Sequence, residues 1–272
     1  MGVVKKPLLL LAAVLAAVVA SSAYAITYGQ YDGNGHPNVG AMLRLSPTTG
    51  NYRIVCTGSL ISPTVYLTAS HCTSFVQSQP DGFKDAWVTF EPTFSSSSTL
   101  PASAIKGTMY TNPLYNQRAS DPEDIAVIVL AEPVTGVTLA QLPSAGLLDQ
   151  LKDAGTLNGT RFTSVGYGIQ EPEPSPGGIQ HAFPMERWVA SGEFNALNKS
   201  WLRISQNDAA GEGGTCSGDS GGPQFLGSGA NETDTQVSIT ITGDTQCNAT
   251  NVDYRLDTPQ ARAFLGQFVL LP

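Results

Sequence analysis

Short β-prone runs separated by turn residues constrain the fold of this chain more than any other feature. They lie at residues 54–55, 65–68, 87–90, 125–130, 161–165 and 237–242. Gly, Pro, Ser, Asn or Asp separate them at short intervals, a rhythm typical of antiparallel sandwiches or barrels rather than of alternating strands and helices. The run at 125–130 is apolar throughout, as expected for a strand buried on both faces. We therefore expect an all-β protein.

Few other segments predict regular structure. The clearest helix candidate is residues 259–268 near the C-terminus, which Asp257 or Thr258 can cap. The serine run at 95–98 and the stretch rich in Pro, Glu and Gly at 171–178 predict surface loops. A segment around 141–154, between two strand-rich halves, is the expected junction of two domains.

The N-terminus has the pattern of a secretory signal peptide. Lys5 and Lys6 precede an apolar run at 8–20, and Ala23-Tyr24-Ala25 supplies an A-x-A cleavage site. A membrane anchor is the alternative, but a bilayer span needs about 20 apolar residues and this run has only 13. We therefore predict a signal peptide at 1–25, cleavage after Ala25, and a secreted protein with no membrane attachment after cleavage.

The charge balance argues against one class of partner. The predicted mature chain has 247 residues, with 12 basic and 22 acidic side chains. Such an excess of negative charge repels phosphate backbones, so we expect no nucleic-acid partner. The length suffices for one large domain or two small ones.

Cysteine usage fits an exported protein. An even number of cysteines in such a chain favours disulfides, and four cysteines allow three pairings. Zinc binding is the alternative, but the chain has no C-x-x-C motif and its histidines are scattered. We therefore expect no metal and no cofactor. The residues concerned are Cys56, Cys72, Cys216 and Cys247, and the histidines are His36, His71 and His181.

The stretch TCSGDSGGP (215–223) carries the features of a nucleophile. Glycines on both sides of Ser220 leave its hydroxyl exposed and let nearby backbone amides turn inward, where they can bind an oxyanion. A serine needs a base, and His71, after the strand-like run at 65–68, is the candidate; we expect His36 and His181 to lie at the surface. Asp124, directly before the buried run at 125–130, can orient the base. Asp121 is the rival carboxylate, but a position before proline is typical of a turn.

Three stretches resemble segments of the chymotrypsin/trypsin family of serine proteases. CTGSLISPTVYLTASHC (56–72) is similar to the family's histidine segment, DIAVIVL (124–130) to its aspartate segment, and GDSGGP (218–223) to its nucleophile motif. The order His, Asp, Ser also matches. VGYG (165–168) resembles the start of the second barrel, and YRLDTPQARAFL resembles the closing strand and helix, so the likeness spans essentially the whole mature chain.

The resemblance implies two six-stranded antiparallel β-barrels with a C-terminal α-helix and a catalytic cleft between the barrels. We assign residues 26–145 to the N-terminal barrel and 146–272 to the C-terminal barrel and helix. Carried over residue by residue, Ser220 is the nucleophile, His71 the general acid/base and Asp124 the orienting carboxylate, with the N–H groups of Gly218 and Ser220 as the oxyanion hole. The implied disulfides are Cys56–Cys72 and Cys216–Cys247.

The resemblance also gives Ile26 a role. In this family a new N-terminus folds inward, and its ammonium group pairs with the aspartate before the nucleophile, here Asp219. Ile26-Thr27-Tyr28-Gly29 resembles the family's Ile-Val-Gly-Gly, so signal cleavage after Ala25 would itself create the activating amine. The alternatives are a slightly different cleavage site and a short propeptide removed by another protease.

The sequence says less about the substrate pocket than about any other part of the site. Trypsin-like members carry a carboxylate six residues before the nucleophile, and here that position is Gly214, which predicts a preference for neutral or apolar side chains. We expect Gly243 on a pocket wall, where its backbone contacts the substrate. SITITGD replaces the family's usual IVSWG, so the alignment of this segment with the family is open. In the alternative alignment Asp244 lies at the pocket, which restores a preference for cationic side chains. Asp208 and Glu212 fall out of register.

The function that follows is a secreted, monomeric serine endopeptidase acting on protein or peptide substrates. A catalytically silent homologue that binds proteins or carbohydrate is the alternative from another class. Silent members usually lose the serine or the histidine, and this chain keeps both, which favours the enzyme. An esterase with the same three residues is a third hypothesis.

Overall fold

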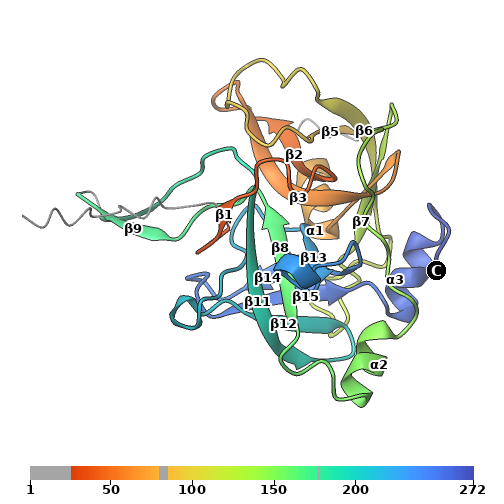
Figure 1. Ribbon diagram of the computed structural model, residues 1–272. Coiled ribbons are helices and arrows are strands. Elements are labelled where there is room, and N and C mark those ends of the chain that lie inside the picture. The colour runs from red at the N-terminus through yellow and green to blue at the C-terminus, as the bar shows by residue number, and fades with distance from the viewer. Residues whose placement is uncertain (1–25, 80–84, 177) are drawn as a thin grey trace, which may run out of the picture.

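A computed structural model describes residues 26–79, 85–176 and 178–272 of the 272-residue chain. The predicted signal peptide, residues 1–25, lies outside the described residues and stays a prediction. The described chain forms two β-barrels, one above the other in Figure 1, with helices α2 and α3 on one flank. Within the described residues no helix is long and apolar enough to cross a bilayer.

The first barrel is closed and antiparallel, with the strand order β2-β3-β4-β7-β6-β5. Its strands are β2 (Val39–Leu45), β3 (Tyr52–Ser62), β4 (Val65–Thr68), β5 (Asp85–Thr89), β6 (Ile105–Thr111) and β7 (Ala126–Leu130). Every residue of β7 except Val129 is buried, as expected from its unbroken apolar run. The pairing of β2 with β3 shifts register between Met42 and Leu43, and such an irregularity increases the bend that barrel closure needs.

The second barrel closes through one long, bent strand. Its strands are β8 (Arg161–Gly166), β11 (Trp188–Leu197), β12 (Trp201–Ser205), β13 (Pro223–Leu226), β14 (Gln236–Gly243) and β15 (Thr250–Arg255). The order is β11-β12-β15-β14-β13-β8, and β11 also pairs with β8. Residues 188–193 of β11 pair with β8 and residues 194–197 with β12, so this strand completes the ring. Two six-stranded antiparallel barrels confirm the predicted fold class.

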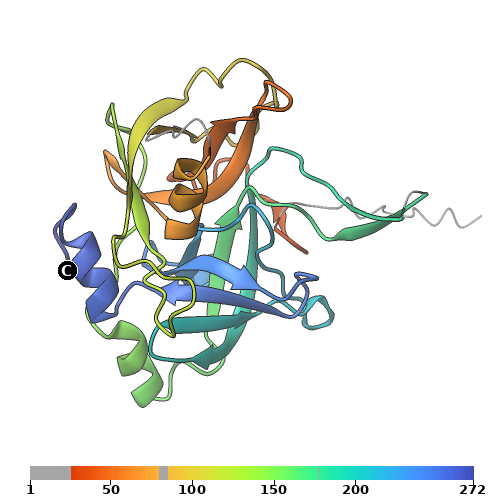
Figure 2. The same ribbon diagram turned by 180° about the vertical axis from the view of Figure 1, so that it is seen from behind.

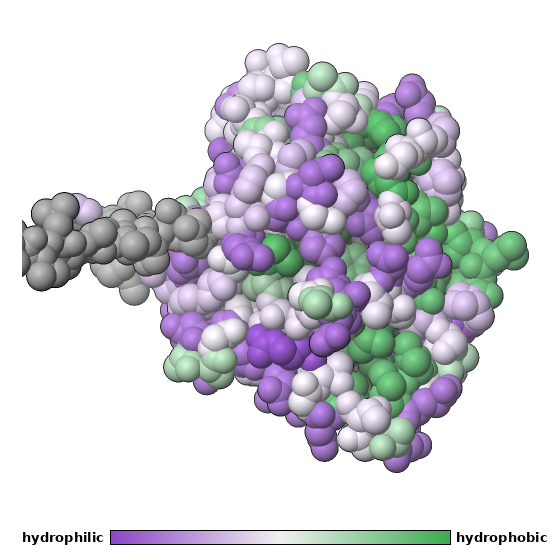
Figure 3. All heavy atoms as spheres, viewed as in Figure 1, coloured by the Kyte–Doolittle hydropathy of each residue, from purple (hydrophilic) through white to green (hydrophobic). Residues whose placement is uncertain are grey.

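Each end of the described chain packs on the barrel that is formed by the other half of the sequence. Near the N-terminus, β1 (Gln30–Tyr31) pairs with β11 of the second barrel. At the other end, α3 (Pro259–Leu265) begins at Thr258, whose Oγ1 accepts a hydrogen bond from the Ala261 amide (3.3 Å). Its buried Phe264 and Leu265 belong to a core cluster formed mainly by residues of the first barrel, and burying such side chains stabilises by about 1.5–3 kcal/mol each. Hydrophobic residues gather over this helix and the chain end at the right of Figure 3.

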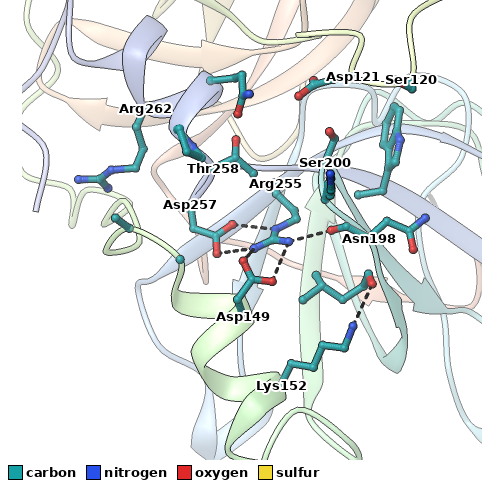
Figure 4. Close-up of a pocket in the computed structure, with 17 residues that line it drawn as sticks. Ser120, Asp121, Asp149, Lys152, Asn198, Ser200, Arg255, Asp257, Thr258 and Arg262 are labelled. Carbon is teal, nitrogen blue, oxygen red and sulfur yellow. Dashed lines mark hydrogen bonds and ion pairs between the residues drawn. The ribbon is translucent and has the colours of Figure 1, made fainter.

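The predicted domain junction at 141–154 contains a helix that we did not predict, α2 (Leu147–Asp153). Arg255 at the end of β15 ties α2 to the last strand, because its guanidinium donates to Asp149 (2.7 Å) and to the buried Asp257 (2.9 Å). Figure 4 shows this cluster, in which Arg255 also donates to the Asn198 carbonyl oxygen. The domain boundary at 145/146 remains a prediction.

Two shorter features differ from the expectations. The residues after β4 form helix α1 (Ser70–Gln77), which packs beside β6 and stands at the front of Figure 2. The expected loop at 171–178 belongs largely to a hairpin of β9 (Pro172–Ser175) and β10 (Gly178–His181), which extends away from the barrels in Figure 1. The serine run at 95–98 lies outside strands and helices, as predicted. Single 3-10 turns occur at Asp208–Ala210 and Gly229–Asn231.

Candidate active site

The tertiary structure holds His71 from two sides. His71 is the second residue of α1, and the preceding Ser70 donates its hydroxyl to the Ile125 carbonyl oxygen (2.7 Å), which ties the helix to β7. The following Cys72 forms a disulfide with Cys56 on β3. The imidazole therefore has little freedom to leave its position beside β7.

Asp124 orients the His71 ring through two hydrogen bonds. Its Oδ1 accepts from the His71 backbone N–H (2.8 Å), and its Oδ2 lies 2.9 Å from His71 Nδ1. A carboxylate only accepts, so this contact places a proton on Nδ1 and leaves Nε2 as the acceptor nitrogen. Asp124 is 2 % exposed, whereas the rival Asp121 accepts from the Glu123 N–H in a turn, as its sequence context predicts.

Ser220 comes from the second barrel, on the turn before β13. Its carbonyl oxygen accepts from the Thr57 N–H of β3 (2.9 Å) and lies 3.7 Å from the Cys72 sulfur. His71 and Ser220 line the same cavity, whose volume is about 420 Å³. The structure thus brings the three predicted residues into one region, although they are far apart in the sequence.

The glycines around Ser220 are sterically required. Gly218 and Gly221 have φ angles of 102° and 78°, which side-chain-bearing residues adopt only with strain. A Cβ on Gly221 would lie 2.2 Å from Thr68 Oγ1 of the first barrel. Among the described residues, no acceptor receives the N–H groups of Gly218 and Ser220. Two unpartnered donors beside a serine hydroxyl can stabilise an oxyanion.

Thr57 is a positioning residue that we did not predict. Its hydroxyl donates to the Gly218 carbonyl oxygen (3.0 Å) and accepts from the Tyr167 N–H (3.1 Å). It therefore anchors Gly218 through its carbonyl group, one peptide unit after the free Gly218 amide. The sequence shows only a threonine in a strand, and this role depends on the contact between the barrels.

Asp219 is fully buried behind the same turn. Its carboxyl oxygens accept from the N–H groups of Gly168 (2.7 Å) and Cys216 (2.9 Å). Burial raises the pKa of Asp219 to about 7, although the two backbone hydrogen bonds oppose the rise. A Cβ on Gly166 or Gly168 would lie 2.0 or 2.4 Å from a carboxyl oxygen, so both glycines of the VGYG stretch make room for Asp219.

The segment that begins at Ile26 is buried in the second barrel. Ile26 and Thr27 are both 0 % exposed, and Ile26 packs against Trp188. The Thr27 carbonyl oxygen accepts from the Gly214 N–H (3.0 Å), and its hydroxyl donates to the Cys247 carbonyl oxygen (2.8 Å). The second predicted disulfide, Cys216–Cys247, is present beside this contact.

Gln206 occupies the space that a side chain at position 214 would take, and it is a second residue that we did not predict. A Cβ on Gly214 would lie 2.1 Å from Gln206 Oε1. The Gln206 amide nitrogen lies 3.4 Å from Asp244 Oδ1, and Gln206 Oε1 is buried without a hydrogen-bond partner. An amide therefore lies where trypsin-like members have a carboxylate. Gln206 is eight positions before Gly214, and no sequence pattern links the two.

The acidic residues near the predicted pocket have structural partners. Asp244 accepts from the backbone N–H groups of residues 246, 248, 249 and 250. Its pKa is lowered, because these hydrogen bonds outweigh its desolvation by burial. Glu212 accepts from the Ser205 hydroxyl and from the Glu193 N–H. Gly243 pairs with Asn251 at the end of β14.

The other two histidines have partners within the protein. His36 is not a free surface residue, because its ring lies between Asp32 and Glu232, and His181 Nδ1 lies 2.6 Å from the Gln170 carbonyl oxygen. Three potential metal ligands, Cys56, His71 and Cys72, lie within 4.8 Å of one another. The two sulfurs are joined in a disulfide, which leaves no thiolate to bind a metal.

Comparisons with known proteins show the family of this chain. The model of the family described as Trypsin matches residues 30–263. The chain belongs to the trypsin family. A relative in this family, the protein named Trypsin from Saccharopolyspora erythraea, is 31 % identical over 177 residues, which cover 63 % of this chain and 70 % of that protein. The chain is therefore a trypsin-like serine protease by family.

Proposed function

We propose that this trypsin-family protein is a secreted serine endopeptidase that hydrolyses protein or peptide substrates through an acyl-enzyme intermediate on Ser220. The observation that carries the proposal is the hydrogen-bonded His71–Asp124 pair, which faces a cavity that Ser220 also lines. A serine is a weak nucleophile without a base, and an imidazole held in one tautomer supplies that base.

In the proposed mechanism, His71 Nε2 takes the Ser220 proton as the hydroxyl oxygen attacks a peptide carbonyl. The Asp124 carboxylate stabilises the imidazolium that forms, and the N–H groups of Gly218 and Ser220 donate to the oxyanion. His71 then returns the proton to the leaving amine, and water resolves the acyl-enzyme by the same steps. One oxyanion donor contributes about 10²–10³ in kcat, so the hydrogen bond by which Thr57 anchors the Gly218 carbonyl group, next to the Gly218 amide, matters for the rate.

The pocket beside Gly214 and Gly243 is proposed to accept neutral side chains. Gln206 presents an uncharged amide where a carboxylate would select cations. Asp253 on the neighbouring strand is fully buried, and burial raises the pKa of its carboxyl group well above the usual value, which disfavours its charged form. Asp244, the alternative, is held by the backbone of its own loop.

We propose that signal cleavage after Ala25 produces the active chain directly. The Thr27–Gly214 pairing fits an Ile26 amine that turns inward toward Asp219. An ammonium group there would ionise the buried carboxyl, and breaking such a buried pair costs about 3–5 kcal/mol. A purified chain with one extra residue before Ile26 should therefore lose most activity. Full activity from a chain with a verified extension would contradict this step.

The test of function is cleavage of a peptide library by the secreted protein and by a Ser220→Ala variant. We expect cleavage by the first only, after neutral residues, and covalent labelling of Ser220 by a fluorophosphonate. A protein that neither cleaves peptides nor reacts with the probe is the silent homologue. A protein that reacts and hydrolyses activated esters but no peptide is the esterase. Sedimentation of the same sample tests the proposed monomer.

A further inference from the structure

We propose that the cavity beside Ser220 and His71 selects substrates that carry a large apolar side chain just after the scissile bond. The inference rests on the proposed function and names a substrate class for it. The selected residue is the first or the second of the leaving segment, and the side chains that bind it are Phe75 and Leu45.

The cavity has an apolar lining next to the reacting residues. Its volume of about 420 Å³ lies in the range of ligand pockets, whose walls are mostly apolar. His71 and the two sulfurs of the Cys56–Cys72 disulfide line it together with Ser220, and the ligand atoms of these three residues lie within 4.8 Å of one another. The other apolar members are Leu45, Pro47, Ile54, Val55 and Phe75. A peptide segment that leaves the nucleophile therefore meets apolar side chains.

Two of these apolar side chains are exposed to solvent. Among the described residues seven large hydrophobic side chains are exposed, and both Leu45 at 39 % and Phe75 at 51 % line this cavity. Single exposed apolar side chains are ordinary on a protein surface, but a group of them in one hollow marks a binding site. Because this group lies beside the candidate nucleophile, the ligand that covers it is the substrate.

Helix α1 places Phe75 at the right distance from the reacting residues. Phe75 follows His71 by four residues, and residues four apart lie on the same face of a helix. The rise between them is about 6 Å, and an extended substrate advances about 3.3–3.6 Å per residue. The first two residues of the leaving segment therefore span the distance from His71 to Phe75.

Strand β3 adds apolar surface to the same cavity through an unpaired residue. The partner of Met42 is Cys56, whereas the partner of the next residue on β2 is Ile54. Val55 between them therefore has no partner on β2. Such a bulge re-aims a side chain, and Val55 is half-buried on the cavity wall. The irregularity that bends the barrel thus also shapes the surface that the substrate meets.

The direction of the substrate follows from the roles of the two barrels. The pocket beside Gly214 belongs to the second barrel and takes the acyl side. Apart from Ser220, every described residue of the cavity comes from the first barrel. His71 lines the cavity and donates its proton to the leaving amine, so the leaving segment starts beside His71 and enters this cavity.

The test uses quenched fluorescent peptides with one common acyl side that the library selects. Either the first or the second leaving-group residue is Leu, Phe, Ala, Gln, Glu or Lys, while Ala fills the other position. Glu and Lys are included because Arg44 and Arg53 also line the cavity. The kcat/KM values are measured at low and high salt for the unmodified protein, Phe75→Gln and Leu45→Gln. The control is Leu114→Gln, which removes an exposed leucine outside the cavity.

We expect Leu or Phe at one of the two positions to raise kcat/KM about tenfold over Gln, because burying such a side chain contributes at least this factor. Salt should not reduce this ratio, since no charge is involved. The ratio should fall to below about threefold in Phe75→Gln and in Leu45→Gln and persist in Leu114→Gln. The rate on the peptide with Ala at both positions should stay nearly constant, because these substitutions are at the surface.

Equal rates for apolar and polar peptides, or a preference for Glu or Lys over Leu, overturn the inference. So does a ratio that survives both cavity substitutions, whereas survival in one variant only assigns the binding to the other side chain. Failure to cleave any peptide above the Ser220→Ala level overturns the proposed function itself.

Discussion

Replacing His36 with glutamine should lower the free energy of unfolding, and the size of this loss should depend on pH. His36 Nε2 lies 2.6 Å from Glu232 Oε1, and Nδ1 contacts Asp32. The ring also stacks on Phe225, with centroids 5.6 Å apart. Asp32 is further held by the fully buried Arg187 at 2.7 Å. This cluster fastens the segment after Ile26 to the second barrel.

The magnitude follows from the pKa of His36. Burial lowers this pKa, but the hydrogen bonds to Asp32 and Glu232 outweigh burial and raise it from 6.5 to about 9. A shift of one pKa unit corresponds to about 1.4 kcal/mol, so protonated His36 contributes about 3 kcal/mol. Because the folded pKa is the higher one, this stability is complete below pH 6.5 and is lost as pH rises through about 9.

The assay is urea unfolding at about pH 6 and about pH 10, in a Ser220→Ala background that prevents self-cleavage. The free energy of unfolding of His36→Gln should be lower than that of the parent by about 3 kcal/mol at the acidic pH and nearly equal at the alkaline pH. A difference of the same size at both pH values would refute the reasoning. A measured pKa of His36 near 6.5 would also refute the reasoning. His181→Gln is the matched control, because His181 contacts a carbonyl oxygen rather than carboxylates.

Three other changes have defined outcomes. Asp124→Asn should lower kcat by about 10⁴, because the amide stabilises the wrong tautomer, and steady-state kinetics on a library-derived peptide would measure it. Cys56→Ser combined with Cys72→Ser opens a loop of sequence separation 16 and should cost about 3 kcal/mol in urea unfolding. Arg187→Leu removes the buried cation that binds Asp32 and leaves this carboxylate with His36 alone; it should cost about 3–5 kcal/mol, seen as a lower Tm. A Tm unchanged by the last substitution would contradict the buried ion pair.

Many of the strands were predictable, because the local pattern of residues within a strand indicates it. The run at 65–68 coincides with β4, and the runs at 125–130 and 161–165 differ from β7 and β8 by one residue at one end. Helices α1 and α2 were missed, since each is eight residues or fewer and their turns are held by tertiary contacts. A short helix has little intrinsic stability, so its sequence pattern is weak.

The three candidate catalytic residues were also predictable, because each lies in a stretch with a local chemical signature. Ser220 stands between glycines whose positive φ angles the structure requires, and Asp124 directly precedes an apolar strand. The surroundings of these residues were not predictable. His36, expected at the surface, pairs with Glu232, which is 196 residues away in the sequence.

The sequence by itself determined the strand rhythm, the family motifs and the candidate catalytic residues, because each depends on neighbours within a few positions. Only the tertiary structure decided that Gln206 fills the space beside Gly214, that Arg44 lies opposite Arg53 on the neighbouring strand, and that Thr57 holds the Gly218 carbonyl group. These contacts arise when two barrels close and dock in one register. Strand pairing and barrel packing set that register, and no local pattern encodes which side chains then meet.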